Sequence, residues 1–124
     1  MNEIILSTLG HTWILDLDGT ILKHNGYLLD GTDSFLPGAK QFLNSIPEKD
    51  MIVFITSREE KYREITECFL KQNRIRFAYI IFNAPYGERI VINDNKPSGL
   101  NMCKAISLKR NSNFSLIIKE EESL

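Results

Sequence analysis

Short apolar runs alternate along this chain with longer segments whose apolar residues recur at helical spacing. The apolar runs, typical of strands covered on both faces of a sheet, occupy residues 12–17, 51–56 and 77–82. The helical spacing occupies residues 39–46 and 57–73. Strands separated by helices of this length favour parallel pairing with right-handed crossovers. The pattern therefore predicts an α/β fold, a three-layer α/β/α sandwich around a mainly parallel, Rossmann-like sheet.

Turn signals and shorter apolar pieces predict the remaining elements. The second helix opens with SREE, residues 57–60, which has the S-x-x-E form of a capping box. Residues 89–93 predict a fourth strand that ends at Asp94, followed by a KPSG turn and a short helical stretch. Two further strand-like pieces, KAISLK and FSLIIK, occupy residues 104–109 and 114–119.

The segment between the first strand and the first helix predicts a small flap. It contains Asn-Gly and Asp-Gly pairs, and Asn-Gly between short apolar pieces is a hairpin signal. We therefore expect a β-hairpin flap over about residues 21–34. At 124 residues the chain is expected to form a single domain, residues 1–124, with an acidic tail at 119–124 in solvent.

Composition and charge exclude several classes of function. The net charge of −1 gives no general electrostatic case for a nucleic-acid partner or an anionic membrane surface. The apolar runs are far shorter than the roughly 20 residues that span a bilayer. The N-terminal segment has no basic region of a signal peptide, so a cytoplasmic location is expected, with Cys68 and Cys103 as free thiols. Cys68 shares a helical face with Ile65 and Phe69 and is expected in the core.

Polar side chains stand where the predicted strands end. Asp16 and Asp18 end the first strand, Thr56 the second and Asp94 the fourth. The carboxyl ends of parallel strands form the ligand-binding edge of such sheets. Asp16 and Asp18 point to the same side of an extended chain, and a divalent cation relieves the repulsion between close carboxylates. Mg²⁺ prefers oxygen ligands, so we expect a magnesium site at this edge.

This set of side chains suits phosphoryl transfer. With Mg²⁺ screening charge, one aspartate can attack a phosphoryl group and form an aspartyl-phosphate, while the other protonates the leaving oxygen and then deprotonates water. Thr56, with Ser57 beside it, and the backbone amides of Gly19 and Thr20 are expected to bind the phosphate oxygens. The alternative for Thr56 and Ser57 is that they only cap a helix.

The strand ends carry motifs that resemble those of the haloacid dehalogenase-type (HAD) hydrolase superfamily. LDLDGT, FITSR and VIND follow one another in the family order over about residues 12–100. The resemblance implies that Asp16 is the nucleophile and that Asp18 is the general acid/base, whose main-chain carbonyl also binds Mg²⁺. It further implies that Thr56 binds phosphate and that Asp94 completes the metal site.

Two positions depart from the family pattern. The third family motif is a Lys or Arg that steadies the nucleophile and the phosphoryl charge, and Ala84 stands in its place here. Arg89 and Lys96 are the nearby cations, and we favour Arg89 because it begins the strand that leads to Asp94; it could also be an ordinary surface residue. Asn93 stands where many relatives carry a first Asp, which implies a weaker hold on the metal.

The resemblance implies a capless phosphatase with an open site. We expect a Mg²⁺-dependent phosphomonoester hydrolase that acts on a sugar phosphate or another small phosphometabolite, with a homo-oligomer covering the site. Three alternatives stay open: a phosphatase of a phosphorylated macromolecule, a catalytically degenerate HAD-like binding module, and a phosphoreceiver-like signalling module. Lys23, Tyr27 and Arg58 border the predicted site as candidate substrate contacts, whereas His11 and Trp13 are expected to serve in packing.

Overall fold

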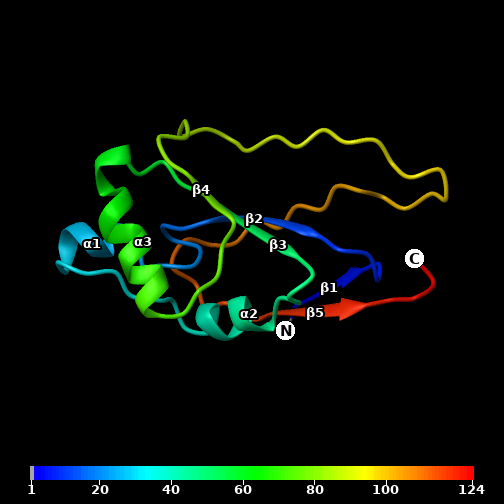
Figure 1. Cartoon of the computed structure of the whole chain (residues 1–124), viewed down its shortest axis with the longest axis horizontal. Coiled ribbons are helices and arrows are strands. Elements are labelled where there is room, and N and C mark those ends of the chain that lie inside the picture. The colour runs from blue at the N-terminus through cyan, green and yellow to red at the C-terminus, as the bar shows by residue number, and fades with distance from the viewer. Residues whose placement is uncertain (1) are drawn as a thin grey trace.

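The computed structural model of the chain describes residues 2–124 (Figure 1). Its strands are β1 (Asn2–Leu6), β2 (Thr12–Asp16), β3 (Met51–Ile55), β4 (Tyr79–Ile81) and β5 (Leu116–Glu120). Its helices are α1 (Gly26–Leu29), α2 (Ala39–Ser45) and α3 (Arg63–Gln72), with a 3₁₀ turn, η1 (Glu60–Tyr62), directly before α3. The protein is thus a small α/β protein, as the alternation of strands and helices predicted.

The strands form two parallel sheets. One has the order β2-β3-β4, and the other pairs β1 with β5. In the first sheet Asp16 lies opposite Ile55, and Ile55 lies opposite Ile81. The carboxyl ends of these strands therefore meet at one edge, which is where the sequence placed the candidate site. Strand β1 was not predicted, and β5 runs to Glu120, so that the expected acidic tail begins later than residue 119.

The core lies on one face of the β2-β3-β4 sheet. Trp13, Ile52 and Phe54 are buried on that face, and the ring of Trp13 meets the ring of Phe42 from α2 edge-on at 5.6 Å. The opposite face leaves about half of the Ile14 side chain exposed. The prediction that both faces of these strands are covered is therefore wrong for β2, and the alternating burial along β2 and β3 reflects this.

The greatest departure from the predicted fold is an extended arm, residues 85–109. Figure 1 shows it in yellow and orange, running out beside the sheet and returning. The strands expected at 89–93 and 104–109 and the short helix between them are absent from the described chain; only the turn at Lys96–Gly99 forms, closed by the Gly99 N–H donating to the Lys96 carbonyl at 2.8 Å. Strand formation needs a partner strand for backbone hydrogen bonds, and the arm has none here.

The flap and the start of the second helix also differ from prediction. Residues 21–34 contain the short helix α1 and not a hairpin, although one antiparallel bridge joins Leu22 to Phe35. The prediction of a capping box at residues 57–60 is wrong, because α3 begins only at Arg63 and no side chain caps it. Cys68 is exposed and not in the core. Among residues 2–124, no helix has the length and apolar character needed to cross a membrane.

A buried carboxylate ties the amino end of the β2-β3 sheet together. Asp50 is 3% exposed, and its carboxylate accepts hydrogen bonds from Trp13 Nε1 at 2.9 Å and from the His11 backbone N–H at 3.0 Å. The His11 ring nitrogen Nδ1 lies 2.9 Å from the same carboxylate. Burial raises the pKa of Asp50, but the hydrogen bonds from Trp13 and His11 together outweigh it and hold the pKa below its ordinary value of 3.8.

This lowered pKa predicts a loss of stability in acid. A carboxyl group whose pKa is lower in the folded than in the unfolded state stabilises the fold at pH values above its unfolded-state pKa. This stabilisation is lost as the pH falls through the folded-state pKa. We expect the thermal unfolding midpoint of the wild-type protein to fall with decreasing pH below about pH 4, and to fall more steeply than that of Asp50→Asn. Thermal denaturation at a series of pH values measures both. Asp30→Asn, in an exposed pair with Lys23, is the matched control and should keep the wild-type acid dependence.

Candidate functional site

The two candidate catalytic aspartates lie in and just after the end of β2, in a turn fixed by the core. Leu17 between them is fully buried, and its carbonyl accepts hydrogen bonds from the backbone N–H groups of Ile21 and Leu22 at 3.0 and 2.9 Å. Gly19 closes the turn with a φ of +84°, a left-handed conformation that glycine adopts without steric cost. The sequence therefore places both carboxylates at this edge through local chemistry alone.

The turn uses its own amides. The Gly19 N–H donates to the Leu22 carbonyl at 2.7 Å, and the Thr20 N–H donates to the Leu17 carbonyl at 3.2 Å. These amides are therefore engaged inside the turn, and the expectation that they bind phosphate oxygens is not met in this arrangement. The Thr20 side chain instead holds the nucleophile candidate, because its Oγ1 donates to Asp16 Oδ2 at 3.0 Å.

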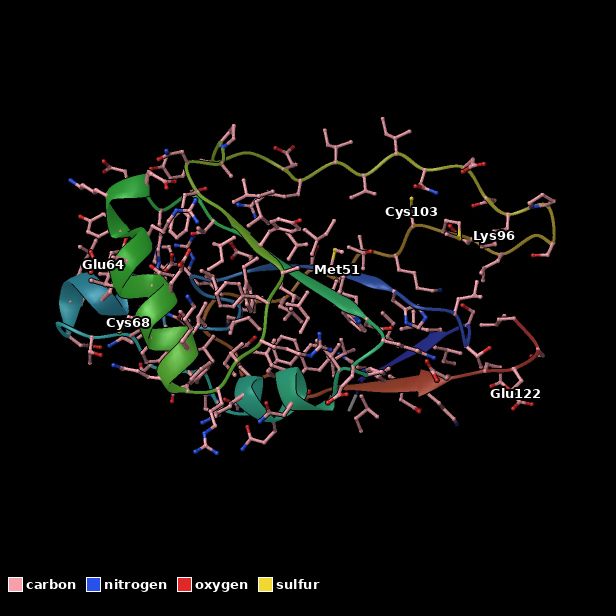
Figure 2. The ribbon with its side chains drawn as sticks, viewed as in Figure 1. Met51, Glu64, Cys68, Lys96, Cys103 and Glu122 are labelled. Atoms are coloured by element: carbon pink, nitrogen blue, oxygen red, sulfur yellow. The ribbon has the colours of Figure 1, made fainter. Side chains whose placement is uncertain are left out.

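Asp16 is accessible and is met by a cation from the arm. A third of its side chain is exposed, and Arg89 NH1 lies 3.4 Å from Asp16 Oδ1 although 73 residues separate them. Of the two cations considered for the missing third motif, the structure thus brings Arg89 to the nucleophile candidate. Lys96 lies near the tip of the arm (Figure 2) and does not belong to the site.

Thr56 follows β3 directly and so stands beside the end of β2. It is 1% exposed, and its Oγ1 accepts a hydrogen bond from the Arg58 backbone N–H at 3.1 Å. Its hydroxyl hydrogen remains able to donate to an oxygen ligand. Ser57 is half-buried, and its Oγ donates to the Pro85 carbonyl at 3.3 Å, which ties the β3 end to the start of the arm.

The buried side chain of Arg58 binds the carboxylate of Asp18. Its Nε and NH2 donate to the two carboxylate oxygens of Asp18 at 2.9 and 3.0 Å. Its NH2 and NH1 also donate to Asp33 at 2.7 and 3.0 Å, and NH1 donates to Thr66 Oγ1 at 2.9 Å. The ring of Tyr27 covers the guanidinium at 3.9 Å.

This network is buried, so it positions Asp18 and does not meet substrate. The side chains of Arg58 and Asp33 are 1% and 2% exposed. Burial lowers the pKa of Arg58, but the hydrogen bonds to Asp18 and Asp33 outweigh it and raise the pKa above its ordinary value. All three guanidinium nitrogens of Arg58 already donate hydrogen bonds inside the protein, so the expected substrate contact is not made in this arrangement. Asp33 and Thr66 were missed, because neither stands in a motif; Asp33 is 25 residues and Thr66 eight residues from Arg58 along the chain.

Asp94 is not brought to the two aspartates. It lies exposed in the arm, where Asn93 Nδ2 donates to its backbone carbonyl at 3.0 Å. Within residues 2–124 there is no group of three or more His, Cys, Asp or Glu side chains placed to hold a metal ion. The expected set of Asp16, Asp18 and Asp94 is therefore not assembled in this arrangement of the arm.

Comparison with known proteins gives structural relatives and no family assignment. No protein-family model and no curated protein matches the chain. Two solved structures match, described as "Structure of the Pnkp1/Rnl/Hen1 RNA repair complex" and "Structure of Pnkp1/Rnl/Hen1 complex". Both are 25% identical with a TM-score of 0.52, and the match covers 68% and 67% of this chain. This chain spans less than a third of those chains, 29% and 31% of their length.

Proposed function

We propose that this protein is a Mg²⁺-dependent phosphomonoester hydrolase of the HAD type that works through an aspartyl-phosphate. The observation that carries the proposal is the accessible carboxylate of Asp16, held by Thr20 and met by Arg89 at the carboxyl end of β2. A carboxylate attacks phosphorus only when cationic groups reduce its repulsion with the phosphoryl oxygens, and Arg89 supplies one such group.

The protein's own side chains account for the two chemical steps. Asp16 attacks phosphorus, its carboxylate oxygen forms a bond to phosphorus, and the bond from phosphorus to the leaving oxygen breaks. Asp18 gives a proton to that oxygen, then takes one from the water that hydrolyses the aspartyl-phosphate and releases inorganic phosphate. Arg58 orients Asp18 through hydrogen bonds to both carboxylate oxygens, which suits the step in which Asp18 takes a proton from water. For the step in which Asp18 gives a proton, one of these two hydrogen bonds has to open so that the freed oxygen can carry that proton.

The described residues fit a Mg²⁺ ion in part. Asp16 offers an accessible carboxylate, and Mg²⁺ needs only one or two carboxylates because it keeps several waters. In the proposal, the main-chain carbonyl of Asp18 and the carboxylate of Asp94 complete the set. The ion supplies charge neutralisation at the phosphoryl oxygens when it is bound.

The proposed Mg²⁺ ligands come together only if the arm, which carries Asp94, docks on the sheet. This docking is part of the proposal. Strand β2 is one of the two edge strands of its sheet, so its outer edge has backbone groups able to pair. Ile90 and Ile92 in the arm are 80% and 92% exposed, and burying apolar surface is favourable. Pairing of residues 89–93 with β2 would carry Asp94 toward Asp16 and add the expected fourth strand to the sheet.

Two substrate classes are candidates for the proposed activity. A small phosphometabolite remains the first candidate, because no described domain covers Asp16. A second candidate, a phosphorylated RNA end, is favoured by the structural likeness to chains of an RNA repair complex. The net charge of −1 does not favour RNA over a small substrate.

A phosphatase assay with metal control tests the proposal. We expect hydrolysis of p-nitrophenyl phosphate with Mg²⁺, loss of activity with EDTA, and a Mg²⁺ requirement raised on the order of tenfold or more in Asp94→Asn. Glu88→Gln, which changes an exposed arm carboxylate directly before the predicted strand 89–93, should behave as wild type. Absence of turnover on a broad phosphate panel would support a binding module instead, and a stable phosphoprotein formed with acetyl phosphate would support a receiver-like module.

A further inference from the structure

A second arginine lies directly on the catalytic turn. An added Cβ on Gly19 would meet Arg110 Cγ at 3.0 Å, so the aliphatic part of the Arg110 side chain covers Gly19. The Gly19 carbonyl accepts a hydrogen bond from the Asn111 backbone N–H at 2.9 Å. Neither Arg110 nor Asn111 belongs to any motif that the sequence singled out, and 91 positions of chain order separate Gly19 from Arg110.

The segment that carries Arg110 is anchored on both sides of the turn. Asn111 Oδ1 accepts a hydrogen bond from the His24 backbone N–H at 2.9 Å. Three residues further on, Phe114 is 8% exposed, its N–H donates to the Pro37 carbonyl at 2.7 Å, and its ring lies 4.5 Å from that of Phe42. Arg110 is therefore placed by the core and not by a free loop.

The guanidinium of Arg110 is available to a ligand. Arg110 is exposed, and no carboxylate of residues 2–124 forms an ion pair with it. The amides of Gly19 and Thr20 are used inside the turn, so anion binding at this turn has to come from side chains. A planar guanidinium is well suited to bidentate binding of phosphate.

The position of Arg110 separates it from the reacting phosphoryl group. The two oxygens of Asp16 face Arg89 and Thr20. Arg110 instead lies on Gly19, the turn residue between Asp18 and Thr20. A cation outside the contacts that Asp16 makes suits a second anionic group of the substrate, and in a phosphomonoester any such group belongs to the leaving part.

We infer that Arg110 is a specificity-determining residue that binds a second phosphate anion, carried by the leaving group of the substrate. The inference rests on the proposed function for the identity of the scissile phosphate. The substrate class is accordingly a phosphomonoester whose leaving group bears another phosphomonoester or a phosphodiester. A small bisphosphate and a phosphorylated nucleic-acid end share this chemistry.

Binding to the Asp16→Asn protein tests the inference without turnover. Titration calorimetry compares a nucleoside bisphosphate with the matching nucleoside monophosphate, each with and without the additional change Arg110→Gln. We expect Arg110→Gln to weaken bisphosphate binding about 10- to 100-fold and monophosphate binding less than about twofold, because one charge-assisted contact is lost. Lys109→Gln, which removes the same charge one residue away, should change neither. A short oligonucleotide with a terminal phosphate distinguishes a small bisphosphate from a nucleic-acid end. If the protein binds the oligonucleotide more tightly than it binds the nucleoside bisphosphate, the ligand is a nucleic-acid end.

The outcomes separate this inference from the proposed function. Equal losses for both ligands, or no preference of the parent protein for the bisphosphate, would overturn the role of Arg110. An active wild-type enzyme with that result keeps the proposed function. If the binding difference appears while wild type hydrolyses nothing with Mg²⁺, the anion site stands and the proposed catalysis fails.

Discussion

Replacing Asp16 with asparagine is expected to reduce the proposed phosphatase turnover by a factor on the order of 10⁴ or more, because the proposed nucleophile is lost. The fold should survive. Asp16 is a third exposed, and an asparagine oxygen can still accept the Thr20 hydrogen bond. The measurements are kcat with Mg²⁺ and the thermal unfolding midpoint of both proteins, together with mass spectrometry of acid-quenched wild type to detect the aspartyl-phosphate.

Asp30→Asn is the control variant for this prediction. Asp30 lies at the end of α1, and Asp30→Asn removes the same charge from an exposed pair with Lys23. That variant should keep wild-type kcat. Turnover by Asp16→Asn close to that of wild type would contradict the role of Asp16 as nucleophile.

The second large effect is on stability. Arg58→Met is expected to lower the free energy of unfolding by about 3–5 kcal/mol, because Asp33, whose side chain is 2% exposed, would lose its cationic partner inside the protein. That is a large part of the roughly 5–15 kcal/mol that holds a domain folded. Urea denaturation followed by circular dichroism measures the change, and kcat should fall as well, since Asp18 loses both Arg58 hydrogen bonds.

Two further variants separate the buried charge from the positioning of Asp18. Arg58→Met combined with Asp33→Asn should regain part of the stability, because the unpaired buried charge is gone, but it should not regain activity. Arg63→Met, in α3, loses partly exposed ion pairs with Glu60 and Glu67 and a contact with the Phe82 ring, and should lower the unfolding midpoint far less than Arg58→Met does. If Arg58→Met is as stable as wild type, the hydrogen-bond network of Arg58 makes no net contribution to the free energy of unfolding.

Local pattern was a good guide wherever a structure depends on neighbours in the chain. The apolar runs predicted β2, β3 and β4, and the spacing of Phe42 and Leu43 predicted α2. The same local chemistry placed Asp16 and Asp18 at the end of β2, because the following turn closes on the carbonyl of Leu17 between them. It failed at residues 89–93, where a strand-like sequence has no neighbouring strand in this arrangement.

The sequence by itself determined the α/β class, the strand ends and the two aspartates that make a phosphoryl-transfer site the leading proposal. Only the tertiary structure decided what surrounds them. Arg58 meets Asp18 from 40 residues away, and Arg89 meets Asp16 from 73 residues away. Such pairs have no periodicity or spacing, because they form only when core packing closes long stretches of chain and brings separate loops to one edge of the sheet.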